Sequence, residues 1–198
     1  MKKIFLDCGG HHFEGLKSFR QKGIIDDSFI VHTFEPNPAC NITQRACDLD
    51  FDIQITPHEK AVWIEDGFVT FNQENHAISQ TGSPSDGTSE IDGWGSSIDG
   101  IGFEHPGYET QVKVQSVDIS AFIDALPEDA YIVCKLDIEG SEFQVLRHLI
   151  RKKTIKRISK IFVEFHERFM PAEDEITRQD LIKAVSAMGV DIEVWGNL

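Results

Sequence analysis

The chain has 198 residues, which suits one α/β domain and leaves little for a second. Its net charge of −14 argues against nucleic acid as a partner, because phosphate binding draws on Lys and Arg. The sequence shows neither an apolar stretch of membrane-spanning length nor a signal sequence at its start. We therefore expect a cytoplasmic protein without a membrane partner.

Apolar segments of strand and helix character alternate along the chain. They predict strands at 3–7, 30–35, 51–56 and 158–165, a strand beginning at 131, and a last one at 190–195. Helices are predicted at 13–22, 39–48, 119–126 and 176–188, and another carries Phe143, Leu146, Leu149 and Ile150 on one face. This alternation predicts a Rossmann-like, doubly wound α/β fold, with a mostly parallel sheet and helices on both faces.

The middle of the chain departs from the alternation. Residues 61–64 and 68–71 flank Glu65-Asp66-Gly67 and predict a hairpin. Residues 72–110 are rich in Gly, Ser, Asp and Asn, which predicts a long loop insertion within a single domain spanning 1–198. A loop of this length is a lid, a binding loop or a disordered segment. Its aromatic residues either close over a substrate or pin the loop to the surface: Trp94, Phe103 and Tyr108.

Two strands end in the same way. Ile4 to Leu6 leads into Asp7-Cys8-Gly9-Gly10, and the strand that begins at Tyr131 leads into Lys135, Asp137, Glu139 and Gly140. In a doubly wound sheet these two strands are neighbours, and the binding crevice opens at their carboxyl ends. We therefore expect Asp7 and Asp137 to face one shared pocket.

Glu35 ends the second predicted strand, 28 residues after Asp7. An acid at this place accepts hydrogen bonds from ribose hydroxyls in nucleotide-binding folds of this type. The alternative is an exposed carboxylate beside a proline turn. Together with the glycine turn after Asp7, the ribose interpretation is favoured.

Several motifs follow one another in the order seen in FkbM-type S-adenosylmethionine-dependent methyltransferases, and the chain resembles that family over nearly its whole length. The motifs are the Asp-x-Gly turn, Phe34–Pro38, Lys60–Val62, Gly95–Ser97, Lys135–Gly140 and Val163–His166. The resemblance implies a class I methyltransferase fold, here with its last strand lacking. It also implies S-adenosylmethionine as cofactor and methylation of a hydroxyl on a sugar or small molecule.

The resemblance also implies roles for individual residues. Asp7, Gly9 and Gly10 would line the methionine part of the cofactor, Glu35 the ribose, and Lys60 and Ala61 the adenine, with Asp137 and Glu139 beneath the reacting centre. The turn departs from the family's Asp-x-Gly-x-x-x-Gly, because position 13 is Phe13 and the next glycine is Gly15. Few elements remain to build a substrate pocket, so the 72–110 insertion or a second subunit of a homo-oligomer would supply it for a small-molecule or glycan acceptor.

A hydroxyl acceptor has a high pKa and needs a base or a metal ion to become a nucleophile. His166 is the first choice for the base, since histidine titrates near neutral pH; the alternative is a surface or capping histidine. Asp137 would orient it or act as base itself; the alternative for Asp137 is a structural role as a cap on the following helix. A less favoured alternative is a divalent ion such as Mg²⁺ on Asp137, Glu164 and His166, with Glu139 as a further possible ligand. Histidines 11, 12 and 32 are interpreted as loop or strand residues.

Two other functions remain open. A non-catalytic module that binds S-adenosylmethionine would keep the fold without turnover. A nicotinamide-dependent oxidoreductase is disfavoured, because the chain has no Gly-x-Gly-x-x-Gly turn.

Overall fold

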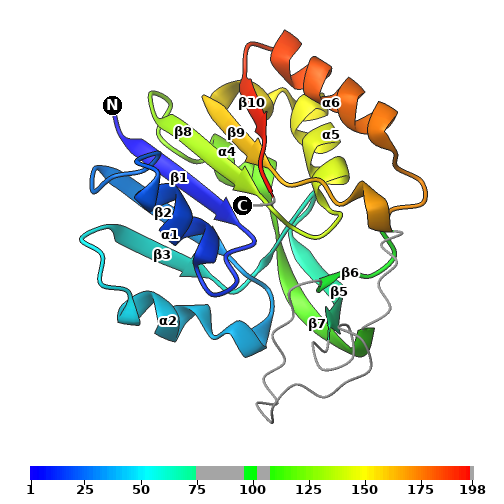
Figure 1. The fold of residues 1–198 in the computed structure, drawn as a ribbon, viewed down its shortest axis with the longest axis horizontal. Helices are drawn as coiled ribbons and strands as arrows, with labels where there is room; N and C mark the ends of the chain where they lie inside the picture. The colour runs from blue at the N-terminus through cyan, green and yellow to red at the C-terminus, as the bar shows by residue number, and fades with distance from the viewer. Residues whose placement is uncertain (75–95, 102–107, 197–198) are drawn as a thin grey trace.

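The computed structural model describes residues 1–74, 96–101 and 108–196. A six-stranded sheet forms the centre of the molecule (Figure 1). Its strand order is β10-β9-β8-β1-β2-β3, and every neighbouring pair is parallel. The strands are β1 (Lys3–Cys8), β2 (Phe29–Phe34), β3 (Gln54–His58), β8 (Tyr131–Leu136), β9 (Lys160–Val163) and β10 (Asp191–Val194). The predicted Rossmann-like α/β fold is confirmed, and no seventh strand joins this sheet within the described ranges.

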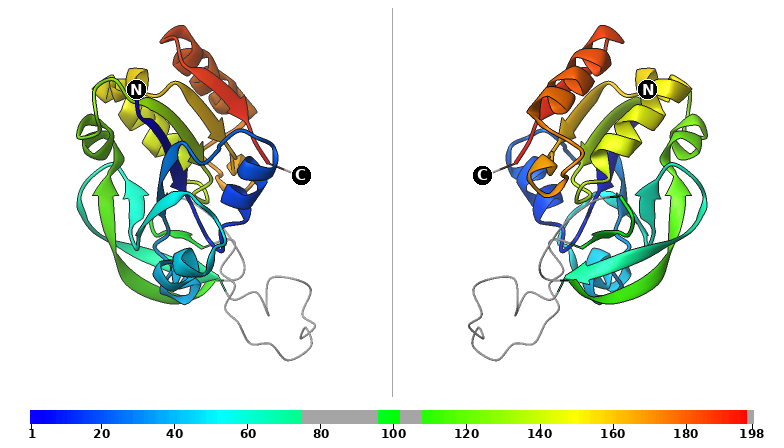
Figure 2. Two further views of the ribbon diagram at one scale, coloured as in Figure 1. Left: turned by 90° about the vertical axis from the view of Figure 1, so that its left-hand side faces the viewer. Right: turned by 90° about the vertical axis from the view of Figure 1, so that its right-hand side faces the viewer.

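Helices cover both faces of the sheet because successive strand residues point to opposite sides. On β1, Ile4 and Leu6 face one core while Phe5 faces the other. The helices are α1 (Glu14–Gln21), α2 (Ile42–Asp48), α4 (Ile119–Asp124), α5 (Glu142–Lys152) and α6 (Glu175–Ala187), and 3-10 helices span Pro38–Cys40, Thr154–Arg157 and Glu167–Phe169. Figure 2 shows α1 and α5 on opposite sides of the sheet. None of the helices in the described part of the chain is long and apolar enough to cross a membrane.

A second, four-stranded sheet has the order β4-β7-β5-β6, from β4 (Ala61–Trp63), β5 (Gly67–Glu74), β6 (Ser97–Ile98) and β7 (Tyr108–Asp118). The predicted hairpin is wrong, because β4 and β5 do not pair with each other. Both pair with β7, where Ser116 lies opposite both Ala61 and Gly67. The Ser116 hydroxyl also donates to the carbonyl of Glu65 (3.0 Å), so the turn wraps around the end of β7.

The predicted 72–110 insertion contributes to this second sheet at its ends and at Ser97–Ile98. Trp94 and Phe103 lie outside the described residues, and Tyr108 begins β7. The hydroxyl of Ser97 donates to the carbonyl of Glu139 (2.6 Å). The insertion therefore contacts the segment that follows β8, where the predicted site residues lie.

Phe19 on α1 fills the centre of one core. Its ring lies 4.8 Å from that of Phe162 and 5.4 Å from those of Phe5 and Trp195, measured between centroids, and none of it is exposed. We expect Phe19→Ala to lower the free energy of unfolding by about 3–5 kcal/mol, since it removes buried area and leaves a cavity. Phe68→Ala, at a ring 61% exposed, removes the same atoms and should change it by less than ~0.5 kcal/mol. Urea unfolding of both variants measures the difference, and equal losses would contradict this account of the core.

Candidate active site at the carboxyl edge of the main sheet

A buried lysine joins the ends of β1 and β8. Asp7 and Lys135 are register partners, and the Nζ of Lys135 lies 3.4 Å from Asp7 Oδ1 and 3.1 Å from Asp137 Oδ2. The same ammonium donates to the carbonyl of Gly9 (2.7 Å). Thr33 on β2 donates to the other oxygen of Asp7 (3.0 Å). Three neighbouring strands thus meet around one ammonium group.

Asp7 and Asp137, at these two strand ends, differ in their exposure to solvent. Burial raises the pKa of Asp7, and Lys135 offsets part of that rise. Burial would lower the pKa of Lys135, but the charges of Asp137 and Asp7 outweigh it and raise that pKa. Asp137 keeps 24% of its side chain exposed, whereas Asp7 is fully buried. The prediction that both acids face one pocket is therefore wrong for Asp7, whose carboxylate is used to hold Lys135.

The glycine turn after β1 packs closely against its neighbours. Gly9 has φ +84°, and a Cβ there would collide with the carbonyl of Asp137; a Cβ on Gly10 would collide with the hydroxyl of Thr33. Both amides donate to the carbonyl of Phe34 at 3.0 Å. The need for glycine at these two positions is thus explained by the meeting of strand ends, and the turn is held against the end of β2.

Glu35 lies at the end of β2 and faces this turn. Its Oε2 accepts from the backbone N–H of His11 (2.9 Å) and its Oε1 from that of Asn37 (2.8 Å). Burial raises the pKa of Glu35, and the two backbone hydrogen bonds work against that rise. Lys60 and Ala61 lie just beyond the carboxyl end of β3, the next strand of the sheet, and Ala61 begins β4. The structure thus brings Glu35 next to the glycine turn, with Lys60 and Ala61 one strand further along.

On the other side of β8, His166 lies among carboxylates. Its Nδ1 is 3.0 Å from Glu142 Oε1, while its Nε2 is 3.3 Å from Glu139 Oε2 and 3.9 Å from Asp137 Oδ1. We call His166, Asp137, Glu139 and Glu142 the His166 cluster. The three residues predicted to act in catalysis therefore lie together, and Glu142 joins them.

Glu142 is the residue of this cluster that the sequence analysis missed. It is the first residue of α5 and is fully buried. Its two carboxylate oxygens accept from the backbone N–H groups of Ile138 (2.7 Å) and Gly140 (2.9 Å). They hold a turn in which Glu139 has the left-handed φ of +50°. An acid in the first turn of a helix was the available signal, since carboxylates favour that position.

The charges in the His166 cluster determine whether His166 is protonated at neutral pH. Burial would lower the pKa of His166, but Glu142, Glu139 and Asp137 outweigh it and raise the pKa to about 10. Burial raises the pKa of Glu139 well above its usual range, although His166 opposes that rise. His166 is therefore an imidazolium at neutral pH, and it has to lose this proton before it can act as a base.

The cluster also offers ligands for a cation. One donor atom each from Asp137, Glu139 and His166 lies within 4.8 Å of the others. The metal alternative drawn from the sequence also included Glu164, which is not in this group of the described residues. The two carboxylates suit a hard divalent ion such as Mg²⁺, whereas the imidazole suits a transition-metal ion.

The raised pKa of His166 makes stability depend on pH. A folded-state pKa of about 10 against 6.5 in the unfolded chain gives a contribution that is complete below pH 6.5 and lost as the pH rises toward 10. In EDTA, to exclude metal effects, the free energy of unfolding of the wild type should fall across that window. His166→Gln should show a smaller fall, because it binds no proton there. Urea unfolding at several pH values measures both slopes, and parallel slopes would contradict the proton assignment.

Comparison with known proteins agrees with this geometry. The family model of the methyltransferase FkbM domain matches residues 7–186, from the end of β1 into α6. Comparisons with curated proteins and with solved structures returned no significant match. The matched range includes the glycine turn, Glu35 and the whole His166 cluster. The chain therefore belongs to the FkbM methyltransferase family, as its motifs had indicated.

Proposed function

We propose that this methyltransferase transfers the methyl group of S-adenosylmethionine to a hydroxyl oxygen of a sugar or small molecule. The observation that carries the proposal is the carboxylate of Glu35. It ends the second strand of a Rossmann-like sheet and is oriented by the amides of His11 and Asn37 toward the edge where such sheets bind nucleosides.

The residues at this edge fit the cofactor. Each carboxylate oxygen of Glu35 accepts one backbone hydrogen bond and has capacity for a further one, which matches the two adjacent hydroxyls of a ribose. The turn at Gly9 and Gly10 has no side chains beside Glu35, which leaves room for a ligand to approach the backbone. Lys60 and Ala61 would border the adenine base. The carboxylates of the His166 cluster would favour a cationic sulfur nearby.

S-adenosylmethionine, when bound, supplies a methyl group on a cationic sulfur that leaves as a neutral thioether. The acceptor oxygen forms the new C–O bond as the S–C bond breaks, and its proton has to go to the protein. We assign that proton to Nε2 of His166. Glu142 accepts the Nδ1–H of His166, which fixes the ring and directs Nε2 toward Asp137 and Glu139.

His166 can take a proton only in its neutral form. The pKa of about 10 belongs to the protein without a second cation in the site. That pKa would fall beside a sulfonium, because like charges disfavour the protonated imidazole. Asp137 and Glu139 would then orient the acceptor hydroxyl, and activity should rise with pH as His166 deprotonates.

Glu35→Gln tests the cofactor site. The substitution keeps the shape of the side chain and removes its charge and one acceptor oxygen, so affinity for S-adenosylmethionine should fall on the order of tenfold. Glu128→Gln, at an exposed site before β8, is the matched control and should leave affinity unchanged. Calorimetric titration measures both, with a thermal melt to show that each variant is folded. Unchanged affinity in Glu35→Gln would refute the ribose placement.

His166→Gln tests the base. We expect kcat to fall by about 10²- to 10⁴-fold with little change in the affinity for S-adenosylmethionine. The rise of kcat with pH should disappear in the variant. Turnover is followed with a labelled methyl donor and a panel of sugars and small hydroxyl compounds, and EDTA is added in parallel. Full activity of the variant would remove His166 from the reaction, and loss of wild-type activity in EDTA would show that the reaction needs a metal ion.

The same assays separate the other two functions. Cofactor binding without methylation of any acceptor would indicate a non-catalytic binding module. Binding of a nicotinamide cofactor without S-adenosylmethionine would indicate an oxidoreductase and overturn the proposal.

A further inference from the structure

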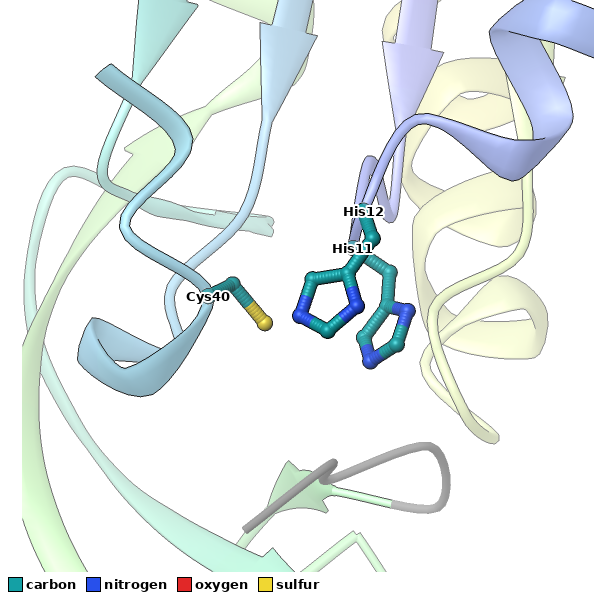
Figure 3. Close-up of side chains that lie close together, drawn as sticks. All are labelled: His11, His12 and Cys40. Atoms are coloured by element: carbon teal, nitrogen blue, oxygen red, sulfur yellow. The ribbon is translucent and has the colours of Figure 1, made fainter. Parts of the chain in front are cut away.

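Two imidazoles and a thiol meet between the β1–α1 turn and the 3-10 helix Pro38–Cys40. One donor atom each from His11, His12 and Cys40 lies within 4.8 Å of the others. Figure 3 shows the sulfur of Cys40 pointing toward the pair of rings. We propose that His11, His12 and Cys40 form a binding site for Zn²⁺. The inference goes beyond methyl transfer and does not depend on it.

The donor set selects the ion. Zn²⁺ prefers imidazole nitrogen and thiolate sulfur, and three protein ligands with a fourth position open to water is a common zinc arrangement. The His166 cluster, with its two carboxylates, offers oxygen donors that suit a hard ion instead. The two donor groups of the described residues therefore differ in the metal that they favour.

Only a small movement is needed to close this group around an ion. Tetrahedral zinc with bonds of about 2.0–2.3 Å places its ligand atoms ~3.3–3.8 Å apart, so the donors, which lie within 4.8 Å of one another, have to approach by at most roughly 1.5 Å. The imidazoles are stacked, with centroids 4.0 Å apart, and remain 16% and 19% exposed, so an ion can reach them and the rings can turn. Rotation about their side-chain bonds supplies the movement.

Cys40 is buried and held from two sides. Its amide donates to the carbonyl of Asn37 (3.1 Å), and its carbonyl accepts from Nε of Arg45 (2.9 Å). The thiol is thus presented on a fixed backbone, and the two histidines are the mobile partners. Because one of the three ligands is already fixed, binding of the ion costs little conformational entropy.

The surroundings of this group favour positive charge. Nδ1 of His11 lies 3.4 Å and Nδ1 of His12 3.9 Å from the carboxylate of Glu14. The carboxylate of Glu14, by accepting the Nδ1–H of His11, leaves Nε2 of that ring as a metal ligand and strengthens it, as in carboxylate–histidine–zinc triads.

The test is a metal titration of the full chain after removal of bound metal by a chelator. Co²⁺ is the first probe, because a cobalt–thiolate bond gives a charge-transfer band in the near ultraviolet and tetrahedral coordination gives strong visible bands. Zn²⁺ is then added against a chromophoric chelator. The wild type should bind one equivalent of Co²⁺ with the thiolate band, and Zn²⁺ should displace it.

Matched variants locate the ion. Cys40→Ser should abolish the thiolate band and weaken Zn²⁺ binding about tenfold or more, and His12→Gln should weaken it likewise. Cys47→Ser, at the exposed cysteine of α2, should leave both unchanged. Thermal melts show that the variants are folded. No binding at micromolar metal, or a thiolate band that survives Cys40→Ser, overturns the proposal. So does binding that Cys40→Ser leaves intact and Glu139→Gln abolishes, which would place the ion on the His166 cluster.

Discussion

The ammonium group of Lys135 holds the candidate site together. It lies 2% exposed between the carboxylates of Asp7 and Asp137 and also donates to the carbonyl of Gly9. A charge buried this deeply is tolerated only with partners, and removing one partner leaves the others uncompensated. Because Gly9 is in turn bonded to the end of β2, the ammonium fixes the turn whose next residues carry the amide that orients Glu35.

On the far side of β8, the buried carboxylate of Glu142 has a role like that of Lys135. The carboxylate of Glu142 holds the turn at 138–140 and orients His166. Asp137 belongs to both arrangements, since it pairs with Lys135 and lies near Nε2 of His166. The residues proposed to act on substrate are therefore positioned by two networks of charged side chains, one around Lys135 and one around Glu142. Both networks include Asp137, so a change in one affects the other through this carboxylate.

The sequence predicts the main sheet and the place of the site because both depend on local patterns. Apolar runs that end in Asp7, Glu35 and Asp137 mark the carboxyl ends of parallel strands, and the structure brings these ends together. The role of Lys135 is not predictable in this way, since its spacing does not show that its side chain turns back under the glycine turn. The hairpin prediction was wrong for a related reason. Glu65-Asp66-Gly67 is a local turn signal, whereas the two flanking strands both pair with β7 around Ser116, which lies 51 residues after Glu65.

The two groups of metal-binding side chains show the same limit. The sequence offered both Glu139 and Glu164 as partners of Asp137 and His166, and it did not show which of them lies close. Glu139 does, in the turn after β8 that Glu142 holds, and no spacing rule describes that turn. His11 and His12 read as loop residues in the sequence. They meet Cys40 only because β1 and β2 are adjacent and a 3-10 helix follows β2.

The span between Lys135 and its partners also has a consequence for biosynthesis. Lys135 and Gly9 are 126 residues apart, so this contact cannot form until the ribosome has released most of the chain. Until then β1, which lies in the middle of the finished sheet, has β2 on one side and an uncovered, apolar edge on the other. Such edges are prone to aggregate, and central strands that pair over long separations fold slowly. The nascent N-terminal half is thus the stage at which the unpaired edge of β1 is open to non-native pairing.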